Sequence, residues 1–349
     1  MTNKQNTPLV SVIMPAYNHE KYVQDAISSI IEQTYENIEL IIIDDGSNDS
    51  TWDKIREMES TCKKRFCKVI FETQKNQGTC KTINKLLLYA NGKYIYFIDS
   101  DDISLNQVIE KEVNFLETNN DYALVVGDNS FIDEHSRPVY LDKNGELTYD
   151  MNAIYKKASD FYKSFRPEIM DNFGSYESLY KGNYIPNGYM VKKSIFDKIG
   201  KFSPKAPLED HWMMLQISKY AKIKYLDEVL LLYRRHSENT INNKKHMVFM
   251  AEKTFNWEYN FVKSIKDKSG IDNIVFQINK NDFKYDGWYI GAATEYPAET
   301  LWLTLIRKRF HNPEYISLWI SINYKLCKSK LRKFLIEHKL YKLKQKKDK

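Results

Sequence analysis

The chain has 349 residues, of which 42% are hydrophobic and 14% aromatic, so it can build a substantial core and is not a disordered chain. Its four cysteines, at 62, 67, 80 and 327, form no CxxC pair, which argues against a disulfide-stapled secreted fold and predicts reduced thiols in a cytoplasmic protein. We expect no secretory signal and no membrane span, because no apolar run approaches roughly 18 residues.

The net charge of +6 is unevenly distributed along the chain. Residues 301–349 hold 14 basic and 3 acidic side chains, a net charge of +11. Residues 1–300 hold the other 38 basic and 43 acidic side chains, a net charge of −5. An acidic body with a basic tail points to an anionic partner for the tail.

Short apolar runs alternate with helical patterns along the first third of the chain. The runs predict strands at 9–14, 39–43, 68–71, 93–98 and 122–126, and apolar residues at helical spacing predict helices at 23–31 and 83–90. This alternation predicts an α/β fold with a mostly parallel, Rossmann-like sheet that has helices on both faces.

The second part of the chain is less regular between residues 128 and 189, which are rich in Tyr, Phe and Lys. Order returns with a predicted strand at 188–191, a helix at 195–199 capped by Gly200, a helix over 213–221 and a strand at 229–233. Beyond residue 239 the pattern turns helical and aromatic, and the chain contains no internal repeat.

Three of the predicted strands end in polar segments, PAYN at 15–18, DDGS at 44–47 and DSDD at 99–102. Ligands bind outside the carboxyl ends of the strands in such sheets. Asp99 and Asp101 directly after a buried strand are costly unless a cation lies between them, and a divalent cation that bridges a diphosphate would meet this need. The alternative is an ordinary turn with solvated acids.

Two further segments have the same ambiguity. Asp44 and Asp45 can accept hydrogen bonds from a base or ribose, or they can serve the backbone of a tight turn with Gly46. The segment Asn76-Gln77-Gly78 precedes a helix that carries Lys81, so it either approaches a phosphate or is a plain loop before a helix.

An acidic pair and a histidine complete the set of candidates. Glu209 and Asp210 lead into an apolar helix, where an acid can cap the helix or act as a general base at the mouth of a cleft. His236 follows a strand and two arginines, where it is either structural or a ligand to a metal such as manganese.

The order of these segments resembles the family 2 inverting glycosyltransferases with the GT-A fold. The resemblance covers about residues 8–240 and is carried by the segments VSVIMPAYNHEKYVQDAISSIIEQTYENIELIIIDDGSNDST, NQGTCKTINKLLLYANGKYIYFIDSDD, NGYMVKKSIFDKIGKF, LEDHW and YRRHSENT. It implies a GT-A catalytic domain at 1–240 and a mainly helical, basic extension at 241–349.

The resemblance also implies roles for individual residues. Nucleotide-sugar contacts are implied for Pro15, Ala16, Tyr17, Asp44, Asp45, Asn76, Gly78, Lys81, Asp99, Ser100 and Asp101. Asp101 and His236 would hold the metal, and Asp210, flanked by Glu209, would be the catalytic base. The family often has Arg at the position of Lys81, so the bidentate phosphate contact of a guanidinium is lost here.

The implied activity is a metal-dependent hexosyl transfer with inversion. The donor would be a nucleoside-diphosphate sugar, the cofactor Mn²⁺ or Mg²⁺, and the acceptor a hydroxyl of a glycan or polyprenyl-linked molecule in surface-polysaccharide or O-antigen assembly. We expect acceptor contacts at Asn187, Gly188 and Trp212 and in the Tyr-rich stretch 150–186. The donor sugar, the acceptor, the linkage and the oligomeric state stay open.

The basic tail allows two interpretations. Trp302, Leu305, Ile306 and Arg309 can form an amphipathic stripe that docks on anionic lipid at the inner face of the cell membrane, or the aromatics can pack on the catalytic domain. No specific nucleic-acid motif is present.

Two rival functions belong to other classes. A sugar-nucleotide nucleotidyltransferase would carry a Gly-rich loop after the first strand, where this chain has PAYNHEKY. A non-catalytic sugar- or nucleotide-binding module could lack the base, yet Asp210 is present.

Overall fold

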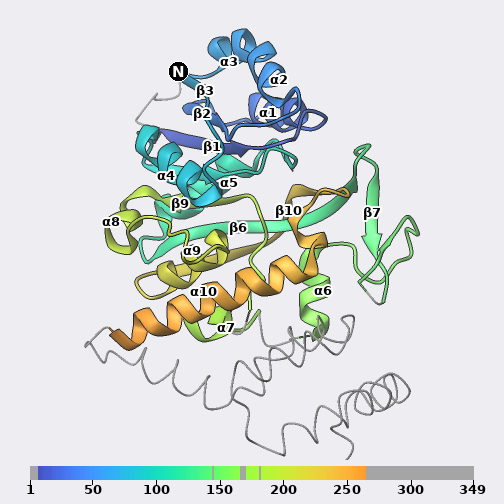
Figure 1. The fold of residues 1–349 in the computed structure, drawn as a ribbon, viewed down its shortest axis with the longest axis vertical. Helices are drawn as coiled ribbons and strands as arrows, with labels where there is room; N and C mark the ends of the chain where they lie inside the picture. Colours follow the sequence, from blue (N-terminus) through green and yellow to red (C-terminus); the bar gives the residue numbers. More distant parts are fainter. Residues whose placement is uncertain (1–6, 144, 166–169, 181, 265–349) are drawn as a thin grey trace, which may run out of the picture. The chain divides into compact units, whose positions relative to one another are not determined.

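The computed structural model describes residues 7–143, 145–165, 170–180 and 182–264 (Figure 1). The chain divides into two units, Met1–Val275 and Phe276–Lys349, and every described residue lies in the first. The predicted basic tail at 301–349 therefore lies outside the described residues.

The first four long strands form the parallel half of the sheet. They are β1 (Val10–Ala16), β2 (Ile38–Asp44), β3 (Lys68–Thr73) and β4 (Tyr94–Phe97), in the order β3-β2-β1-β4. Almost every side chain of β1, β2 and β4 is buried, because these strands are covered on both faces. The register pairs Ala16 with Asp44, so the polar segments after β1 and β2 leave the sheet side by side.

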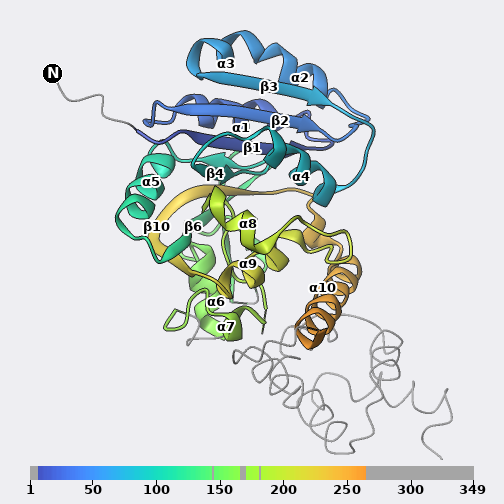
Figure 2. The same ribbon diagram turned by 90° about the vertical axis from the view of Figure 1, so that its left-hand side faces the viewer.

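The other half of the sheet is mixed. Strand β9 (Tyr189–Lys192) lies antiparallel between β4 and β6 (Tyr122–Asp133). The long strand β10 (Lys222–Arg235) runs parallel to β6, and Figure 2 shows how strongly β10 curves. The prediction of a mostly parallel sheet with flanking helices is confirmed, with β9 as an antiparallel insertion.

Short strands extend this half at its edge. Strand β5 (Ile103–Ser104) pairs antiparallel with β10, while β7 (Pro138–Leu141) pairs with β6 and with β8 (Leu147–Thr148). Helix α6 (Ala158–Phe165) lies against β6, and its Ala158 joins a small apolar cluster with Phe131, Val139 and Leu141. The irregular stretch of the sequence thus contains several short elements.

Helices cover the strands as the apolar spacing predicts. Helix α1 (Val23–Ile31) buries Val23, Ala26, Ile27 and Ile30, and α4 (Thr79–Tyr89) packs on β1 and β2. Among the helices before residue 120, three have no counterpart in the sequence prediction: α2 (Thr51–Glu57), α3 (Glu59–Arg65) and α5 (Val108–Thr118). Helix α8 (Phe196–Ile199), preceded by the 3₁₀ turn Lys193–Ile195, ends at Gly200 with a φ of 77°, as expected for a glycine cap.

A buried polar network joins the last described helix to the sheet domain. Glu258 on α10 (Lys244–Ser264) accepts hydrogen bonds from Tyr176 at 2.7 Å and Gln216 at 2.6 Å, and pairs with Lys219 at 2.5 Å. These partners belong to, or directly follow, α7 (Tyr176–Tyr180) and α9 (Glu209–Ser218). A second short 3₁₀ turn, Thr240–Asn242, precedes α10. The domain boundary at residue 240 stays a prediction, although α10 is anchored across it.

Two sequence expectations concern the chain's environment. Among the helices of the described ranges, none is both long and apolar enough to cross a membrane. Cys62, Cys67 and Cys80 are free thiols.

Helix α5 brings a carboxyl group into the core. Glu112 is fully buried where α5 meets β6 and β9, and neither of its carboxyl oxygens makes a hydrogen bond of normal geometry among the described residues, although the backbone amide of Gly127 is near enough to favour the charged form slightly. Burial raises the pKa of Glu112 well above its usual value of 4.5. The folded chain therefore holds a proton here that the unfolded chain releases, and the stability of the fold decreases as the pH rises above about 4.5.

We predict that Glu112→Met stabilises the protein by about 1–3 kcal/mol at pH 7, because it removes an unsatisfied buried polar group. The gain should increase between pH 5 and pH 8, since Met lacks the titration that weakens the wild type. Chemical denaturation across this pH range measures both effects. Glu36→Met, at an exposed position, is the control. A gain that stays constant with pH would contradict the assignment of a protonated Glu112.

Candidate functional site

The segments after β1 and β2 form one unit at the carboxyl edge of the sheet. The amide of Asp45 donates to the carbonyl of Ala16 at 2.8 Å, and that of Asn18 donates to the Ser47 hydroxyl at 2.9 Å. Asn18 has a positive φ of 55°, which asparagine tolerates better than most residues. Pro15 and Ala16 are largely buried here, while the Tyr17 side chain is 43% exposed. Tyr17 is thus free to contact a ligand.

Asp45 joins this unit to the Asn76-Gln77-Gly78 loop. Its carboxylate accepts hydrogen bonds from the amides of Gln77 and Gly78 at 2.9 and 2.8 Å. A side chain at Gly46, where φ is 75°, would place its Cβ 2.7 Å from the amide nitrogen of Asn76. Asn76, Gly78 and Lys81 are exposed beside Asp45 at the start of α4, so the structure brings these predicted residues together.

The Asp44 carboxylate is used in hydrogen bonds within the protein. Its buried carboxylate accepts hydrogen bonds from the Thr73 hydroxyl at 2.7 Å and from both the amide and the hydroxyl of Ser47. These contacts account for the residue as a tight turn that also ties β2 to β3. The nucleotide contact expected of Asp44 and Asp45 stays a prediction.

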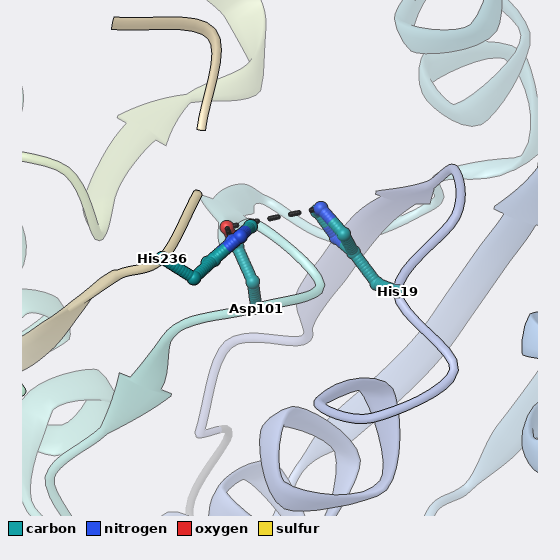
Figure 3. A group of neighbouring side chains, drawn as sticks. All are labelled: His19, Asp101 and His236. Carbon is teal, nitrogen blue, oxygen red and sulfur yellow. Dashed lines mark hydrogen bonds and ion pairs between the residues drawn. The ribbon is translucent and has the colours of Figure 1, made fainter. Parts of the chain in front are cut away.

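Asp101 lies where three segments meet, as Figure 3 shows. Its Oδ2 atom is 2.9 Å from Nε2 of His236, 3.2 Å from the side-chain amide nitrogen (Nδ2) of Asn239 and 3.8 Å from Nε2 of His19. The ligand atoms of His19, Asp101 and His236 all lie within 4.8 Å of one another. Carboxylate and imidazole donors converging on one point fit a divalent first-row cation.

Sequence reasoning missed His19, whose position is fixed by the middle residue of the DSD segment. Nδ1 of His19 is 2.8 Å from the hydroxyl oxygen of buried Ser100. Burial lowers the pKa of His19, an effect that Asp101 opposes and His236 adds to, so the ring is neutral at pH 7. The available signal was its place directly after PAYN, at the end of a strand adjacent to β4.

The carboxylates after β4 are crowded. Asp102 is fully buried, and burial together with the charges of Asp101 and Asp99 raises its pKa well above the usual range. The Asp99 side chain is partly open to solvent, yet the surrounding protein and the charges of Asp101 and Asp210 raise its pKa to about 7. Several carboxyl groups therefore cluster at this edge of the sheet, as the sequence predicts. A cation would offset part of the repulsion between their negative charges.

A buried arginine supports this loop from behind. The Arg234 side chain is 1% exposed and donates from Nε to the carbonyl of Asp101 at 2.8 Å and from Nη2 to Asp25 at 3.0 Å. Its main-chain amide donates to the Asp102 carboxylate at 2.9 Å. Arg234 thus positions the loop instead of facing a ligand. Nε of the next residue, Arg235, is buried without a partner in the described part of the chain.

Asp210 lies in the first turn of α9, where the helix dipole favours a negative charge. Its Oδ2 accepts a hydrogen bond from the Asn183 amide group at 2.8 Å. The Asp210 charge contributes to the raised pKa of Asp99, so these two predicted residues are close enough to interact electrostatically. Burial and the Asp210 charge raise the pKa of Glu209 to about 8, so Glu209 keeps its proton at neutral pH.

The three residues expected at the acceptor differ in their surroundings. The amide group of Asn187 donates to Asp99 at 2.9 Å. Gly188 has a φ of 73°, and a Cβ there would lie 2.5 Å from the Leu231 side chain, which is a packing reason for glycine. Trp212 is 7% exposed and packs against Phe202. Asn187 thus faces the acids, and the acceptor role of all three stays a prediction.

Comparison with known proteins identifies the family to which this chain belongs. The model of glycosyl transferase family 2 matches residues 11–174. An uncharacterised glycosyltransferase of Haemophilus influenzae is 32% identical over 246 residues, which cover 69% of this chain and 70% of that protein.

Two solved structures share the fold at low sequence identity. A mannosyltransferase of Pyrobaculum calidifontis, in complex with GDP-Man and Mn²⁺, aligns over 93% of this chain and 89% of its own with a TM-score of 0.58 and 14% identity. Residues 1–349 of TarS from S. aureus, in complex with UDP-GlcNAc, align over 82% and 80% of the two chains with a TM-score of 0.51 and 17% identity. The chain is therefore a glycosyltransferase of family 2, with the GT-A fold.

Proposed function

We propose that this glycosyltransferase moves a hexosyl group, with inversion, from a nucleoside-diphosphate sugar to a hydroxyl of a glycan or polyprenyl-linked acceptor in surface-polysaccharide assembly. The observation that carries the proposal is the position of Asp210, held by Asn183 at the start of α9 and within reach of the charge on Asp99. A carboxylate near a cluster of acids at the strand ends suits a base that faces a bound donor.

The nucleotide would lie over the unit formed by the segments after β1 and β2. The exposed ring of Tyr17 supports a contact with the base, and Asp45 holds the backbone of the Asn76–Gly78 loop close by. Lys81 is exposed in the first turn of α4 and would neutralise phosphate as a point charge. The complexes of two fold neighbours with GDP-Man and UDP-GlcNAc support a donor of this class.

Asp101 and His236 would hold Mn²⁺ or Mg²⁺ beside the diphosphate. The distance of 2.9 Å between their Oδ2 and Nε2 atoms and the Mn²⁺ in the mannosyltransferase complex support this site. When bound, such a cation supplies positive charge that offsets the negative charge of the leaving diphosphate. Asn239, Ser100 and Arg234 keep the protein side of the site in position through their hydrogen bonds.

The chemistry would need one displacement. Asp210 takes the proton of the acceptor hydroxyl as its oxygen forms the new bond to the anomeric carbon. The bond between that carbon and the diphosphate oxygen breaks, and its electron pair leaves with the diphosphate, so the configuration inverts. No protein nucleophile is required. Glu209, protonated near neutral pH, flanks the base without competing for the proton.

The remaining assignments concern the acceptor and the membrane. Asn187 contacts Asp99 and would reach the boundary between donor sugar and acceptor, near Gly188 and Trp212. The catalytic part would comprise residues 1–240, and the basic residues 301–349, outside the described residues, would hold the enzyme peripherally on an anionic cytoplasmic membrane surface.

We predict that Asp210→Asn keeps donor affinity within about threefold and lowers transfer by about 10²–10⁴-fold, because only the proton acceptor is lost. A thermal-shift panel of nucleoside-diphosphate sugars with Mn²⁺ identifies the donor and reports its binding. Release of nucleoside diphosphate then reports turnover. Asp53→Asn, at an exposed position of α2, is the control. Turnover at the wild-type rate would remove Asp210 from the role of base.

We further predict that Asp101→Asn abolishes the part of donor affinity that depends on the divalent cation, a loss of at least about tenfold. Donor titrations with Mn²⁺ and with excess chelator measure this difference. The chelated values for wild type and variant should agree, since the nucleotide unit is untouched. If the cation effect persists in the variant, Asp101 is not its ligand.

For the tail, we predict that replacing Lys342, Lys344, Lys346 and Lys347 by Gln in the full chain weakens binding to anionic vesicles by at least about tenfold. The same replacement at Lys63, Lys64, Lys75 and Lys143, which are exposed on the catalytic part, should have little effect. Vesicle flotation at two salt concentrations gives the comparison. Equal flotation of both variants and the wild type would exclude the tail as the membrane contact.

A further inference from the structure

We propose that His19 is a third protein ligand of the cation, and that the resulting set of two imidazoles and one carboxylate selects manganese-type cations over magnesium. The inference rests on the proposed function, in which Asp101 and His236 hold the cation of the transfer reaction. It adds a residue that neither the sequence motifs nor the comparisons assign.

The hydrogen bonding of His19 leaves one ring nitrogen free to ligate. Nδ1 is 2.8 Å from the Ser100 hydroxyl oxygen, and with its proton there, Nε2 carries the lone pair. Nε2 points at Oδ2 of Asp101 from 3.8 Å, which is beyond a hydrogen bond (Figure 3). Two lone pairs that face each other at this distance leave a place for a cation between them.

The other side of Asp101 differs, because Nδ1 of His236 is buried without a hydrogen-bond partner among the described residues. His236 brings Nε2 to 2.9 Å from Oδ2, and the Asn239 amide nitrogen lies 3.2 Å from Oδ2 and 3.0 Å from that Nε2. The three ligand atoms lie within 4.8 Å of one another. Atoms that share one ion at about 2.1 Å each are about 3–4 Å apart, so small side-chain movements suffice.

The chemistry of this donor set decides the cation. Magnesium prefers oxygen ligands in a nearly ideal octahedron and gives up its waters reluctantly. Imidazole nitrogens favour first-row transition cations, and two of them strengthen that preference. His236 already supplies one imidazole beside the Asp101 carboxylate, and the second imidazole from His19 would strengthen the discrimination between Mn²⁺ and Mg²⁺.

Ser100 acquires a role in this arrangement. A ligating histidine is normally oriented by a hydrogen bond at its other nitrogen, and the buried Ser100 hydroxyl provides that partner for His19. The amide of His19 donates to the Thr51 hydroxyl at 2.7 Å, which fixes the loop that carries the ring. His19 lies two residues after Tyr17 in the same loop, so cation binding by His19 would also hold the loop that carries Tyr17.

The test measures metal binding directly, in the full chain without donor. Titration of Mn²⁺ followed by electron paramagnetic resonance gives affinity, and spin-echo modulation of the bound ion counts coordinated nitrogens. We expect two nitrogens in the wild type and one in either His19→Gln or His236→Gln. His19→Gln should lower Mn²⁺ affinity at least about tenfold and Mg²⁺ affinity, measured by competition, less than about threefold.

Three comparisons make the result decisive. His135→Gln, at an exposed loop position, should leave the nitrogen count and both affinities unchanged. Ser100→Ala should lower Mn²⁺ affinity while keeping two nitrogens, because it only loosens the ring. A single nitrogen in the wild type, lost in His236→Gln but not in His19→Gln, would overturn the role of His19 and leave the proposed function intact. Mn²⁺ binding that is unaffected by Asp101→Asn would overturn the inference and the proposed cation site together.

Discussion

The guanidinium of Arg234 holds the loop after β4 against the end of β10. It is almost fully buried, and its charge is met mainly by the carbonyls of Asp101 and Asp133 and by one carboxylate, that of Asp25. A buried cation is stable only when nearly all its donors are used, so a shift of any partner has a large energetic cost. The same strand end carries His236, and the position of Asp101 relative to His236 therefore depends on Arg234.

Much of the sheet could be predicted from the sequence because its central strands are buried on both faces. The apolar runs of β1, β2 and β4 need no partner to be identified, whereas β6 and β10 continue past their apolar runs into polar residues. There Asp133 and Arg235 are neighbours in the strand register of β6 and β10, and this register is known only from the three-dimensional structure. The antiparallel direction of β9 depends on the path of residues 134–188, which local patterns do not fix. The short helices α2 and α3 each bury only one or two side chains, too few for a periodic signal.

The candidate site could be predicted where a polar segment follows an apolar run. Asp45 and Asp101 were identified in this way, whereas Asp210 was identified by its place before an apolar helix and by the family resemblance. His19 was not predicted as a site residue, because its partner Ser100 is 81 residues away in sequence and a lone histidine is usually structural. The sequence does not distinguish the roles of the two arginines before His236. In the structure, Arg234 donates a hydrogen bond to Asp25 and lies over the ring of Tyr22. Arg235 instead has a buried Nε without a partner in the described residues.

The acids of the site are held by neutral donors. Asn187 donates to Asp99, Asn239 to Asp101 and Asn183 to Asp210. Lysine and arginine side chains within the described ranges make no ion pair with these three carboxylates, although ion pairs are frequent elsewhere on this domain. An amide fixes the direction of a carboxylate and leaves its charge in place, whereas a salt bridge would cancel it. Burial and the charges of Asp101 and Asp210 together raise the pKa of Asp99, and a cation bound among these acids would offset the part of the shift that comes from repulsion. Under the proposed function, part of the affinity for the cation would therefore come from relieving a repulsion that the fold already holds.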